Sequence, residues 1–219
     1  MYQIEHLVVG SYQANCYLLT NEAGTLVIDP GAQADYILDA LEGRDTIGIV
    51  VTHCHSDHIG AVNEIVEATG AWVACGVDDV DGMADTHRSG FDLEGSDYAV
   101  TQCDRALKEG ETLTWGSDSL TVIHTPGHTP GSICLADETS RYLFSGDMLF
   151  AGSIGSTLWV LGDDAAMSSS CDKLAALPGE YWVLPGHGVP TELSVERAML
   201  RSYAAHLRRQ LKASWREGE

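Results

Sequence analysis

The feature that most restricts the fold of this chain is residues 52–58, which read Thr-His-Cys-His-Ser-Asp-His. Four side chains able to bind a metal follow one another there in the pattern His-x-His-x-Asp-His. On an extended segment, His53 and His55 leave the same side of the backbone, whereas the adjacent Asp57 and His58 diverge. The chain must therefore turn at Asp57, which can aim one pair of side chains at one ion and the next pair at a second. Imidazole and carboxylate together suit zinc, iron or manganese, so we predict a metal site and not a chance group of surface histidines.

Further candidate ligands occur in one repeated context: a short β-prone run that ends in a turn bearing Gly or Pro. The four runs are Ile47–Val51 before His53, Leu120–Ile123 before His124 and His128, Tyr142–Phe144 before Asp147, and Tyr181–Leu184 before His187. Strand ends in a layered α/β fold lie along one edge of a sheet, where loops build sites. We therefore expect these side chains to converge although they are far apart in the sequence.

These motifs resemble those of the metallo-β-lactamase superfamily and, within it, the small glyoxalase II-like hydrolases. The matching pieces, in family order, are residues 28–31 (Ile-Asp-Pro-Gly), 53–58, 124–131 (His-Thr-Pro-Gly-His-Thr-Pro-Gly), 145–147 (Ser-Gly-Asp), 152–155 (Gly-Ser-Ile-Gly) and 185–187 (Pro-Gly-His). The resemblance implies an α/β fold, a four-layer αββα sandwich with the metal site at one edge of its two sheets. A length of 219 residues suits one such domain with a single sizeable core.

The resemblance also implies which side chains bind which ion. Metal 1 is expected on His53, His55 and His128, and metal 2 on Asp57, His58 and His187, with Asp147 bridging the two. The expected cofactors are two divalent ions, zinc first, with iron or manganese as alternatives. Asp29 is expected to accept a hydrogen bond from a ligand histidine and so to orient its ring. Cys54 is expected to be a packed thiol, His87 a solvated loop residue and His124 a packed or orienting residue.

This ligand set predicts a dinuclear metallo-hydrolase of thioesters or esters, similar to hydroxyacylglutathione hydrolase. Two divalent ions about 3.5–4 Å apart share a water and lower its pKa towards 7, which supplies a bridging hydroxide at neutral pH. The hydroxide attacks the carbonyl, metal 1 stabilises the oxyanion, and Asp57 is the expected catalytic carboxylate that manages the remaining proton. Two alternatives stay open: a mononuclear iron oxidase of the persulfide dioxygenase type, and a metal-binding protein without turnover.

The resemblance weakens where glutathione would bind. Relatives continue Gly-Ser-Ile-Gly with Arg-Thr-Asp, whereas this chain has Ser156, Thr157 and Leu158, and no Lys or Arg lies between Arg141 and Lys173. The longer C-terminal extension of glyoxalase II enzymes is also missing. We therefore expect S-lactoylglutathione to be a poor substrate, unless Arg201, Arg208 or another residue of the basic terminal segment supplies the charge.

The remaining elements are predicted from periodicity. Strands are expected at residues 4–9, 15–19 and 25–28, a helix at 33–42, and one helix after the metal motif that includes Ile59, Val62, Ile65 and Val66. Residues 76–105 are expected to be a variable loop region that helps to cover the site. Residues 194–219 are expected to form an amphipathic C-terminal helix whose apolar stripe is Val195, Met199, Tyr203, Leu207 and Leu211, with Arg197, Arg201, Arg208 and Lys212 solvated opposite it.

The amino-acid composition limits the kinds of partner that this chain is expected to bind. A formal net charge of −20 argues against nucleic acid and anionic membranes, so the expected partner is a small-molecule thioester or ester. No apolar run is long enough to span a membrane and no N-terminal segment resembles a signal peptide. The six cysteines contain no Cys-x-x-Cys pair, which is typical of reduced thiols in a cytosol, and we expect a cytoplasmic protein. The oligomeric state stays open.

Overall fold

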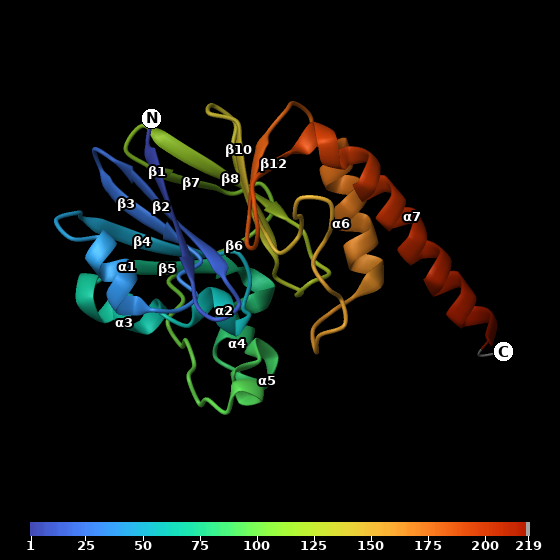
Figure 1. Ribbon diagram of the computed structural model, residues 1–219, viewed down its shortest axis with the longest axis horizontal. Helices are drawn as coiled ribbons and strands as arrows, with labels where there is room; N and C mark the ends of the chain where they lie inside the picture. Colours follow the sequence, from blue (N-terminus) through green and yellow to red (C-terminus); the bar gives the residue numbers. More distant parts are fainter. Residues whose placement is uncertain (218–219) are drawn as a thin grey trace.

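The computed structural model describes the backbone of residues 1–217 and the side chains of residues 1–213. Its centre is a pair of six-stranded sheets (Figure 1). The first sheet has the order β1 (Gln3–Val9), β2 (Ala14–Asn21), β3 (Gly24–Ile28), β4 (Thr46–Val51), β5 (Trp72–Gly76) and β6 (Arg105–Leu107). The second has the order β12 (Thr191–Glu192), β11 (Trp182–Pro185), β10 (Tyr142–Gly146), β9 (Ile133–Asp137), β8 (Asp118–His124) and β7 (Thr112–Trp115).

Helices cover the outer face of each sheet. The helices α1 (Ala34–Ala40), α2 (Ser56–Ile59) and α3 (Val62–Thr69) lie on the first sheet, and α6 (Asp164–Ala176) and α7 (Leu193–Glu217) lie on the second (Figure 1). Three apolar clusters fill the three interfaces that this arrangement creates, one between the sheets and one under each helical layer. The expected α/β sandwich with four layers is therefore confirmed.

The alternation of side chains along the strands explains why both faces of each sheet are apolar. In β3, Leu26 and Ile28 belong to the cluster between the sheets, whereas Val27 belongs to the cluster under α1 and α3. Every residue of β3 and of β9 is buried. Strands β3 to β6 run parallel, as expected for strands that are covered on both faces and connected through helices. Their carboxyl ends therefore meet at one edge.

The single helix expected after the metal motif is two helices, α2 and α3, separated at Gly60 and Ala61. The N–H of Ala61 donates to the carbonyl of Pro30 at 2.9 Å, so this amide leaves the helical ladder. A Cβ at Gly60 would lie 2.4 Å from the carbonyl oxygen of Gly31. The break therefore holds the metal motif tightly against the turn that follows β3.

The segment between β5 and β6 contains more regular structure than a loop. It holds the short helices η1 (Val77–Asp79), α4 (Val80–Met83), α5 (Thr86–Ser89) and η2 (Phe91–Glu94). We call residues 77–102 the lid segment. The hydroxyl of Ser56 donates to the carboxylate of Glu94 at 2.7 Å, which ties this segment to the metal motif.

The terminal helix α7 exists, but its predicted apolar stripe is wrong in part. Val195 is 67% exposed and Tyr203 is 36% exposed, whereas Leu193, Leu200, Ala204 and Leu207 are buried against α6 and the second sheet. A spacing of four residues advances 400° on a helix of 3.6 residues per turn, so each step drifts around the axis. Successive residues of the buried face, from Leu193 to Leu207, are therefore seven, four and three positions apart.

Of the basic residues of α7 expected to be solvated, Arg201, Arg208 and Lys212 are exposed and Arg197 is half-buried, but the three arginines also contact α6. The guanidinium groups of Arg197 and Arg201 donate to the carbonyl of Ala175, at 2.9 Å and 3.1 Å, near the C-terminal end of α6. Arg208 forms an ion pair with Asp172 in the middle of α6. Cations are favoured at the C-terminal end of a helix, where carbonyls lack partners. These contacts use Arg201 and Arg208 to fasten α7 to α6.

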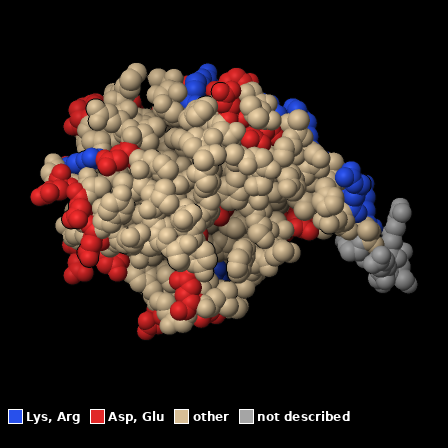
Figure 2. Space-filling view, viewed as in Figure 1, with Lys and Arg blue, Asp and Glu red and all other residues tan. Residues whose placement is uncertain are grey.

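Acidic side chains dominate the surface, in keeping with the net charge of −20 (Figure 2). They gather on the side of the molecule that carries β3, β4 and α1, while basic side chains lie along α7 on the opposite side (Figure 2). Among the described residues, none of the helices combines the length and the apolar character needed to cross a bilayer.

Candidate metal centre

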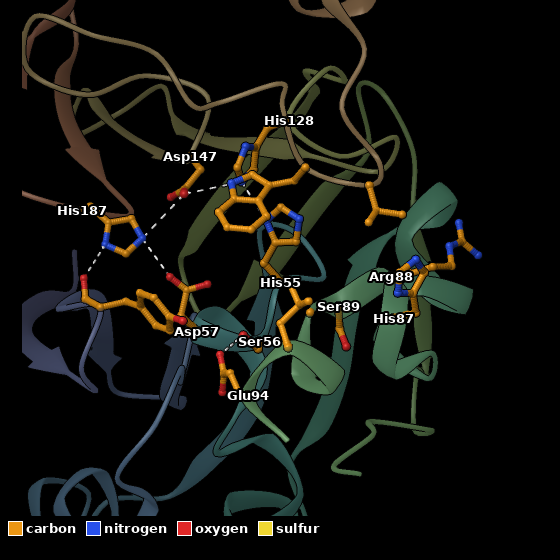
Figure 3. Close-up of a pocket in the computed structure, with 15 residues that line it drawn as sticks. His55, Ser56, Asp57, His87, Arg88, Ser89, Glu94, His128, Asp147 and His187 are labelled. Atoms are coloured by element: carbon orange, nitrogen blue, oxygen red, sulfur yellow. Dashed lines mark hydrogen bonds and ion pairs between the residues drawn. The ribbon is translucent and has the colours of Figure 1, made fainter. Parts of the chain in front are cut away.

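Seven side chains capable of binding metal converge at the edge where the strands of both sheets end. His53 and His55 follow β4, Asp57 and His58 belong to α2, and His128, Asp147 and His187 follow β8, β10 and β11. Figure 3 shows His55, Asp57, His128, Asp147 and His187 turned towards a common space. The strand-end contexts thus bring together residues that lie up to 134 positions apart, His53 and His187.

The first donor group consists of His53, His55 and His128, whose ring nitrogens lie within 4.8 Å of one another. Nδ1 of His55 lies 2.8 Å from Nε2 of His128. All three rings meet at steep angles, with centroids between 4.5 and 4.9 Å apart. This arrangement directs three nitrogens at one point and leaves room for a single ion.

The second donor group consists of Asp57, His58 and His187, again with donor atoms within 4.8 Å. Nε2 of His187 lies 3.1 Å from Oδ2 of Asp57 and 3.3 Å from Nε2 of His58. Asp147 stands between the two groups, since its Oδ2 is 3.5 Å from Nε2 of His128 and 3.6 Å from Nε2 of His187. His53, His58 and Asp147 also form a donor group within 4.8 Å, so the two groups adjoin and the carboxylate of Asp147 lies within reach of both.

Each of four histidines is oriented by a partner on the ring nitrogen that faces away from the centre. Nδ1 of His58 donates to Asp29 at 3.0 Å, and Nδ1 of His128 donates to the carbonyl of Ser156 at 2.7 Å. Nδ1 of His187 donates to the carbonyl of Tyr12 at 3.1 Å, and Nδ1 of His53 lies 3.1 Å from the hydroxyl of Thr52. Such bonds place an N–H on the outward nitrogen and aim Nε2 at the centre, where a metal ion could replace its proton.

The inward atoms fit metal ions better than any hydrogen-bond partner within the described structure. Nε2 of His53 is buried without a hydrogen-bond partner, and buried Oδ1 of Asp147 has none beyond an ion-pair contact of 3.4 Å with Nε2 of His58. An unsatisfied buried polar atom costs about 1–3 kcal/mol, so native structures rarely keep one without a reason. Lone pairs of imidazole nitrogen and carboxylate oxygen that face one another match the ligand chemistry of zinc or iron. The residues present therefore fit two divalent ions.

The electrostatics of the centre favour a cationic occupant. Burial lowers the pKa of His53, and burial together with His128 lowers that of His55 to about 3, so both rings are neutral donors. Burial opposes ionisation of Asp147, yet the neighbouring His58 outweighs it and lowers the pKa of the carboxyl. Burial likewise opposes the charge on His58, but Asp57 and Asp147 raise its pKa. The carboxylates thus attract positive charge into this space.

Close packing of backbone completes the floor of the centre. A Cβ at Gly186 would lie 2.2 Å from Oδ1 of Asp147 and 2.8 Å from Cε1 of His58. No side chain larger than hydrogen can occupy this position without moving a donor. The Gly of the 185–187 turn is therefore required by the space that Asp147 and His58 occupy.

Asn15 and Tyr17 position the turn that carries His187, and they were not predicted. The side chain of Asn15 donates to the carbonyls of Pro185 at 2.9 Å and Gly188 at 3.0 Å, and the hydroxyl of Tyr17 donates to Pro185 at 2.7 Å. Asn15 is 1% exposed. A signal existed, because Asn is depleted in strands and a buried Asn inside β2 requires partners.

Asp79 is a second supporting residue, and it lies in the region expected from the sequence to be a variable loop. It is fully buried and accepts from the N–H of Cys54 at 3.0 Å, the hydroxyl of Thr129 at 2.6 Å and the N–H of Gly131 at 2.7 Å. It thereby joins the turn that carries His53 and His55 to the turn that carries His128.

Three other residues lie where the sequence placed them, outside the donor groups. Cys54 is fully buried in the cluster under the helices of the first sheet. His87 is exposed in the lid segment and bonds to Asp92 at 2.8 Å. Nε2 of His124 donates to the carbonyl of Pro130 at 2.8 Å.

The donor groups open into a cavity of about 330 Å³. One wall is the lid segment, with Arg88, Leu93 and Glu94, and another is the loop after Gly155, with Trp159 and Val160. Leu93, Trp159 and Val160 are 67%, 54% and 56% exposed, so the mouth of the cavity is apolar. Figure 3 shows Arg88 on the side of the cavity opposite His187 and Asp57.

Arg88 changes the expectation that a cation is missing near the site. The segment from Arg141 to Lys173 indeed contains none, but the lid segment contributes Arg88 to the same cavity from elsewhere in the chain. Within the described residues its guanidinium forms neither a hydrogen bond nor an ion pair with another side chain. Ser156, at the position expected for a lost cation, instead orients His128 through its carbonyl, and its hydroxyl accepts from the N–H of Leu158 at 3.1 Å.

Comparisons with known proteins agree with this architecture. A family model described as the metallo-beta-lactamase superfamily matches residues 9–187. The probable metallo-hydrolase YqgX of Bacillus subtilis (strain 168) is 33% identical over 86% of this chain and 92% of its own length. Hydroxyacylglutathione hydrolase GloC of Haemophilus influenzae is 29% identical over 89% of this chain and 94% of its own length.

Two solved structures share both sequence and fold with this chain. The BLEG-1 B3 metallo-beta-lactamase is 32% identical with a TM-score of 0.82, and the match covers 89% of this chain and 96% of that one. TTHA1623, solved in a di-iron-bound form, is 32% identical with a TM-score of 0.76 over 88% of this chain and 96% of that one.

Proposed function

Because the chain belongs to the metallo-beta-lactamase superfamily, we propose that it is a dinuclear metal-dependent hydrolase of thioesters or esters. The observation that carries the proposal is the pair of donor groups joined by Asp147 at the floor of a cavity. His53, His55 and His128 would hold one ion, Asp57, His58 and His187 the other, and Asp147 would contact both. Zinc is the first candidate, with iron and manganese as alternatives, since all accept imidazole and carboxylate ligands.

Two bound divalent ions supply a water of lowered pKa and positive charge beside the reacting carbonyl. The protein's own residues would then determine the orientation of the ligands and the transfer of the proton from the attacking water. Asp57 lies on the cavity wall, and its pKa is depressed because His58 and the hydrogen bond from His187 outweigh burial. It is therefore a carboxylate throughout the neutral range, and its place on the cavity wall makes it the candidate to receive the proton that the attacking water would release. Asp29, Ser156 and Tyr12 hold the histidine rings in place during the reaction.

The cavity supports a substrate with an apolar part and a negative charge. Leu93, Trp159 and Val160 offer apolar surface beside the donor groups, and Arg88 offers one cation on the far side. Glutathione carries two carboxylates, and the other side chains of the wall include Glu94. We therefore infer that S-lactoylglutathione is a poorer substrate than a thioester with a single carboxylate and an apolar acyl chain.

A second candidate function is hydrolysis of the strained amide of a β-lactam, because the BLEG-1 structure carries that activity in its name and matches 89% of this chain. An iron oxidase with three protein ligands is less well supported, since the second donor group is complete. The free thiols of all six cysteines support a reducing, cytoplasmic location and the acidic surface supports a small-molecule partner without nucleic acid.

The test is a comparison of metal-loaded protein across substrate classes. Protein reconstituted with zinc, iron or manganese is analysed for metal content and assayed with aryl esters, N-acetylcysteamine thioesters, S-lactoylglutathione and a chromogenic cephalosporin, with oxygen consumption followed on a glutathione persulfide. Two ions per chain and thioester turnover are expected. One ion per chain after reconstitution, or oxygen uptake in place of hydrolysis, would contradict the proposal.

A further inference from the structure

Two cysteines from different segments lie in contact at the base of the lid segment. Sγ of Cys75, in β5, is 3.7 Å from Sγ of Cys103, which precedes β6. Cys75 is buried, whereas Cys103 is half-buried and reaches solvent. No part of the metal centre uses either thiol. A buried thiol beside a reachable one is the arrangement in which a second cysteine can capture an oxidised first one.

The backbone holds this pair in place from both sides. The N–H of Asp104 donates to the carbonyl of Val73 at 2.8 Å, and the N–H of Val73 donates to the carboxylate of Asp104 at 2.8 Å. Val73 and Cys75 lie two apart on β5, so their side chains share one face. Cys103, next to Asp104, is therefore fixed against that face. Closing a bond of about 2.0 Å needs only a short approach of the two sulfurs.

We propose that Cys75 and Cys103 form a redox-active dithiol that hydrogen peroxide converts into an intramolecular disulfide. In the first step the thiolate of Cys103 attacks the peroxide, whose O–O bond breaks, to give a sulfenic acid and hydroxide, which becomes water. In the second step the sulfur of Cys75 attacks the sulfenic sulfur and expels a second water. The two thiols lose two electrons and two protons, and one peroxide is reduced to two waters.

The ionisation of the pair supports this order of events. The hydrogen bond from the Cys75 thiol lowers the pKa of Cys103 to about 7, and the same bond together with burial raises the pKa of Cys75. A lowered pKa increases the share of Cys103 that is thiolate at neutral pH, and the thiolate is the reactive form. Burial raises the pKa of the other four thiols, Cys16, Cys54, Cys134 and Cys171, which are buried and inert.

The disulfide would tie together the two ends of the lid segment. Residues 77–102 lie between the two cysteines and carry Arg88, Leu93 and Glu94 into the cavity. Cross-linking residues 28 positions apart restricts the unfolded chain and opposes separation of the lid ends. Oxidation should therefore raise the Tm by roughly 5–10 °C for a domain of this size.

The test uses the full-length, zinc-loaded protein. Reduced protein is treated with hydrogen peroxide, quenched by alkylation and mapped by mass spectrometry. The expected product has lost two hydrogen atoms, contains a Cys75–Cys103 link, melts at higher temperature and returns to the starting mass with dithiothreitol. Cys103→Ser should abolish the link, and Cys171→Ser, a buried cysteine in α6, should keep it.

A second measurement needs no variant. The rate at which iodoacetamide modifies Cys103 in the wild-type protein should rise with a midpoint near pH 7, below the value of about 8.5 for a free thiol. Oxidation of Cys103 to sulfinic acid without a link, a link to another cysteine or to a second chain, or an alkylation midpoint at 8.5 or above would each overturn the proposal.

Discussion

Asp147 is the residue on which the two donor groups depend. Its carboxylate lies within 3.6 Å of a ring nitrogen from each group and keeps one buried oxygen without a hydrogen-bond partner. In the proposed arrangement the other ligands hold one ion each. Removing this carboxylate should therefore disturb both ions, whereas removing a histidine should disturb one.

We predict that Asp147→Ala lowers the metal content below two ions per chain and lowers kcat/KM by more than about 100-fold, since loss even of an orienting partner costs 10–100-fold. Elemental analysis and thioester assays on protein loaded under identical conditions would show this. Asp81→Ala, an exposed acid of the lid segment, is the matched control and should leave both quantities unchanged. Two ions and wild-type turnover in Asp147→Ala would show that the carboxylate does not bridge.

Arg88 is the second residue that leads to a prediction, since its charge in the cavity should favour substrates that carry a carboxylate. We predict that Arg88→Ala lowers kcat/KM by about tenfold for an N-acetylcysteamine thioester that ends in a carboxylate, because losing a charged partner costs about 1–3 kcal/mol. The thioester of equal length that ends in a methyl group should be unaffected. Arg209→Ala, an exposed arginine on α7, should change neither.

The charge explanation also predicts a salt dependence. Screening acts over roughly 8–10 Å at ordinary ionic strength, so the preference of the wild-type protein for the carboxylate thioester should shrink as salt rises. Equal losses on the two thioesters in Arg88→Ala would assign Arg88 a structural role. No turnover of any thioester by the wild-type protein would instead refute the proposed function.

At the scale of elements, Asp79 joins two turns that lie 75 positions apart in the sequence, at Cys54 and Thr129. All three of its partners are donors, so an amide in its place would point an N–H at a donor. We predict that Asp79→Asn lowers the free energy of unfolding by about 1–3 kcal/mol. Urea denaturation of the metal-free protein measures this without interference from metal binding. Asp81→Asn is the control, and equal midpoints for the two variants would contradict the assignment.

The corrected face of α7 leads to a paired prediction. Leu200 is fully buried, whereas Val195, part of the stripe predicted from spacing alone, is 67% exposed. Leu200→Ala should cost about 2–5 kcal/mol and Val195→Ala less than about 0.5 kcal/mol. Thermal unfolding of both variants beside the wild type would decide. A larger loss of stability in Val195→Ala than in Leu200→Ala would instead support the apolar stripe in which every fourth residue is buried.

At the scale of the whole molecule, the metal centre connects the two sheets. His53, His55, Asp57 and His58 come from the first sheet and its helix, whereas His128, Asp147 and His187 come from the second. Ions held by both sets of ligands would bind the folded protein and not the unfolded chain, so their affinity adds to stability.

We predict that chelation lowers the Tm by roughly 10 °C, since a ligand at a thousand times its Kd adds about 4 kcal/mol and 1 kcal/mol shifts the Tm of such a domain by 2–4 °C. Differential scanning calorimetry of zinc-loaded protein, EDTA-treated protein and EDTA-treated protein with zinc restored would measure it. An unchanged Tm after verified removal of metal would mean that the ions do not hold the sheets together.

Much of this protein could be read from local patterns. The first four strands of the first sheet and the strand ends that carry His or Asp depend on residue type and short spacing, and the family resemblance then implied which seven side chains converge. A histidine next to a strand end carries its chemistry in its side chain, and the sheet places all such ends on one edge. Those features can therefore be predicted without knowledge of any distant contact.

Other features depend on contacts between distant segments and leave little mark on the sequence. The carbonyls of Tyr12 and Ser156 orient His187 and His128, and every residue has a carbonyl. Arg88 and Cys103 acquire their surroundings only because the lid segment folds back beside β5 and the metal motif. The buried face of α7 is set by the surface of α6 on which it lies. A metal-binding side chain can be recognised from its residue type and its near neighbours in the sequence. The orientation of the histidine rings, the placement of Arg88 in the cavity and the pairing of the two thiols instead arise from packing between segments far apart in the chain.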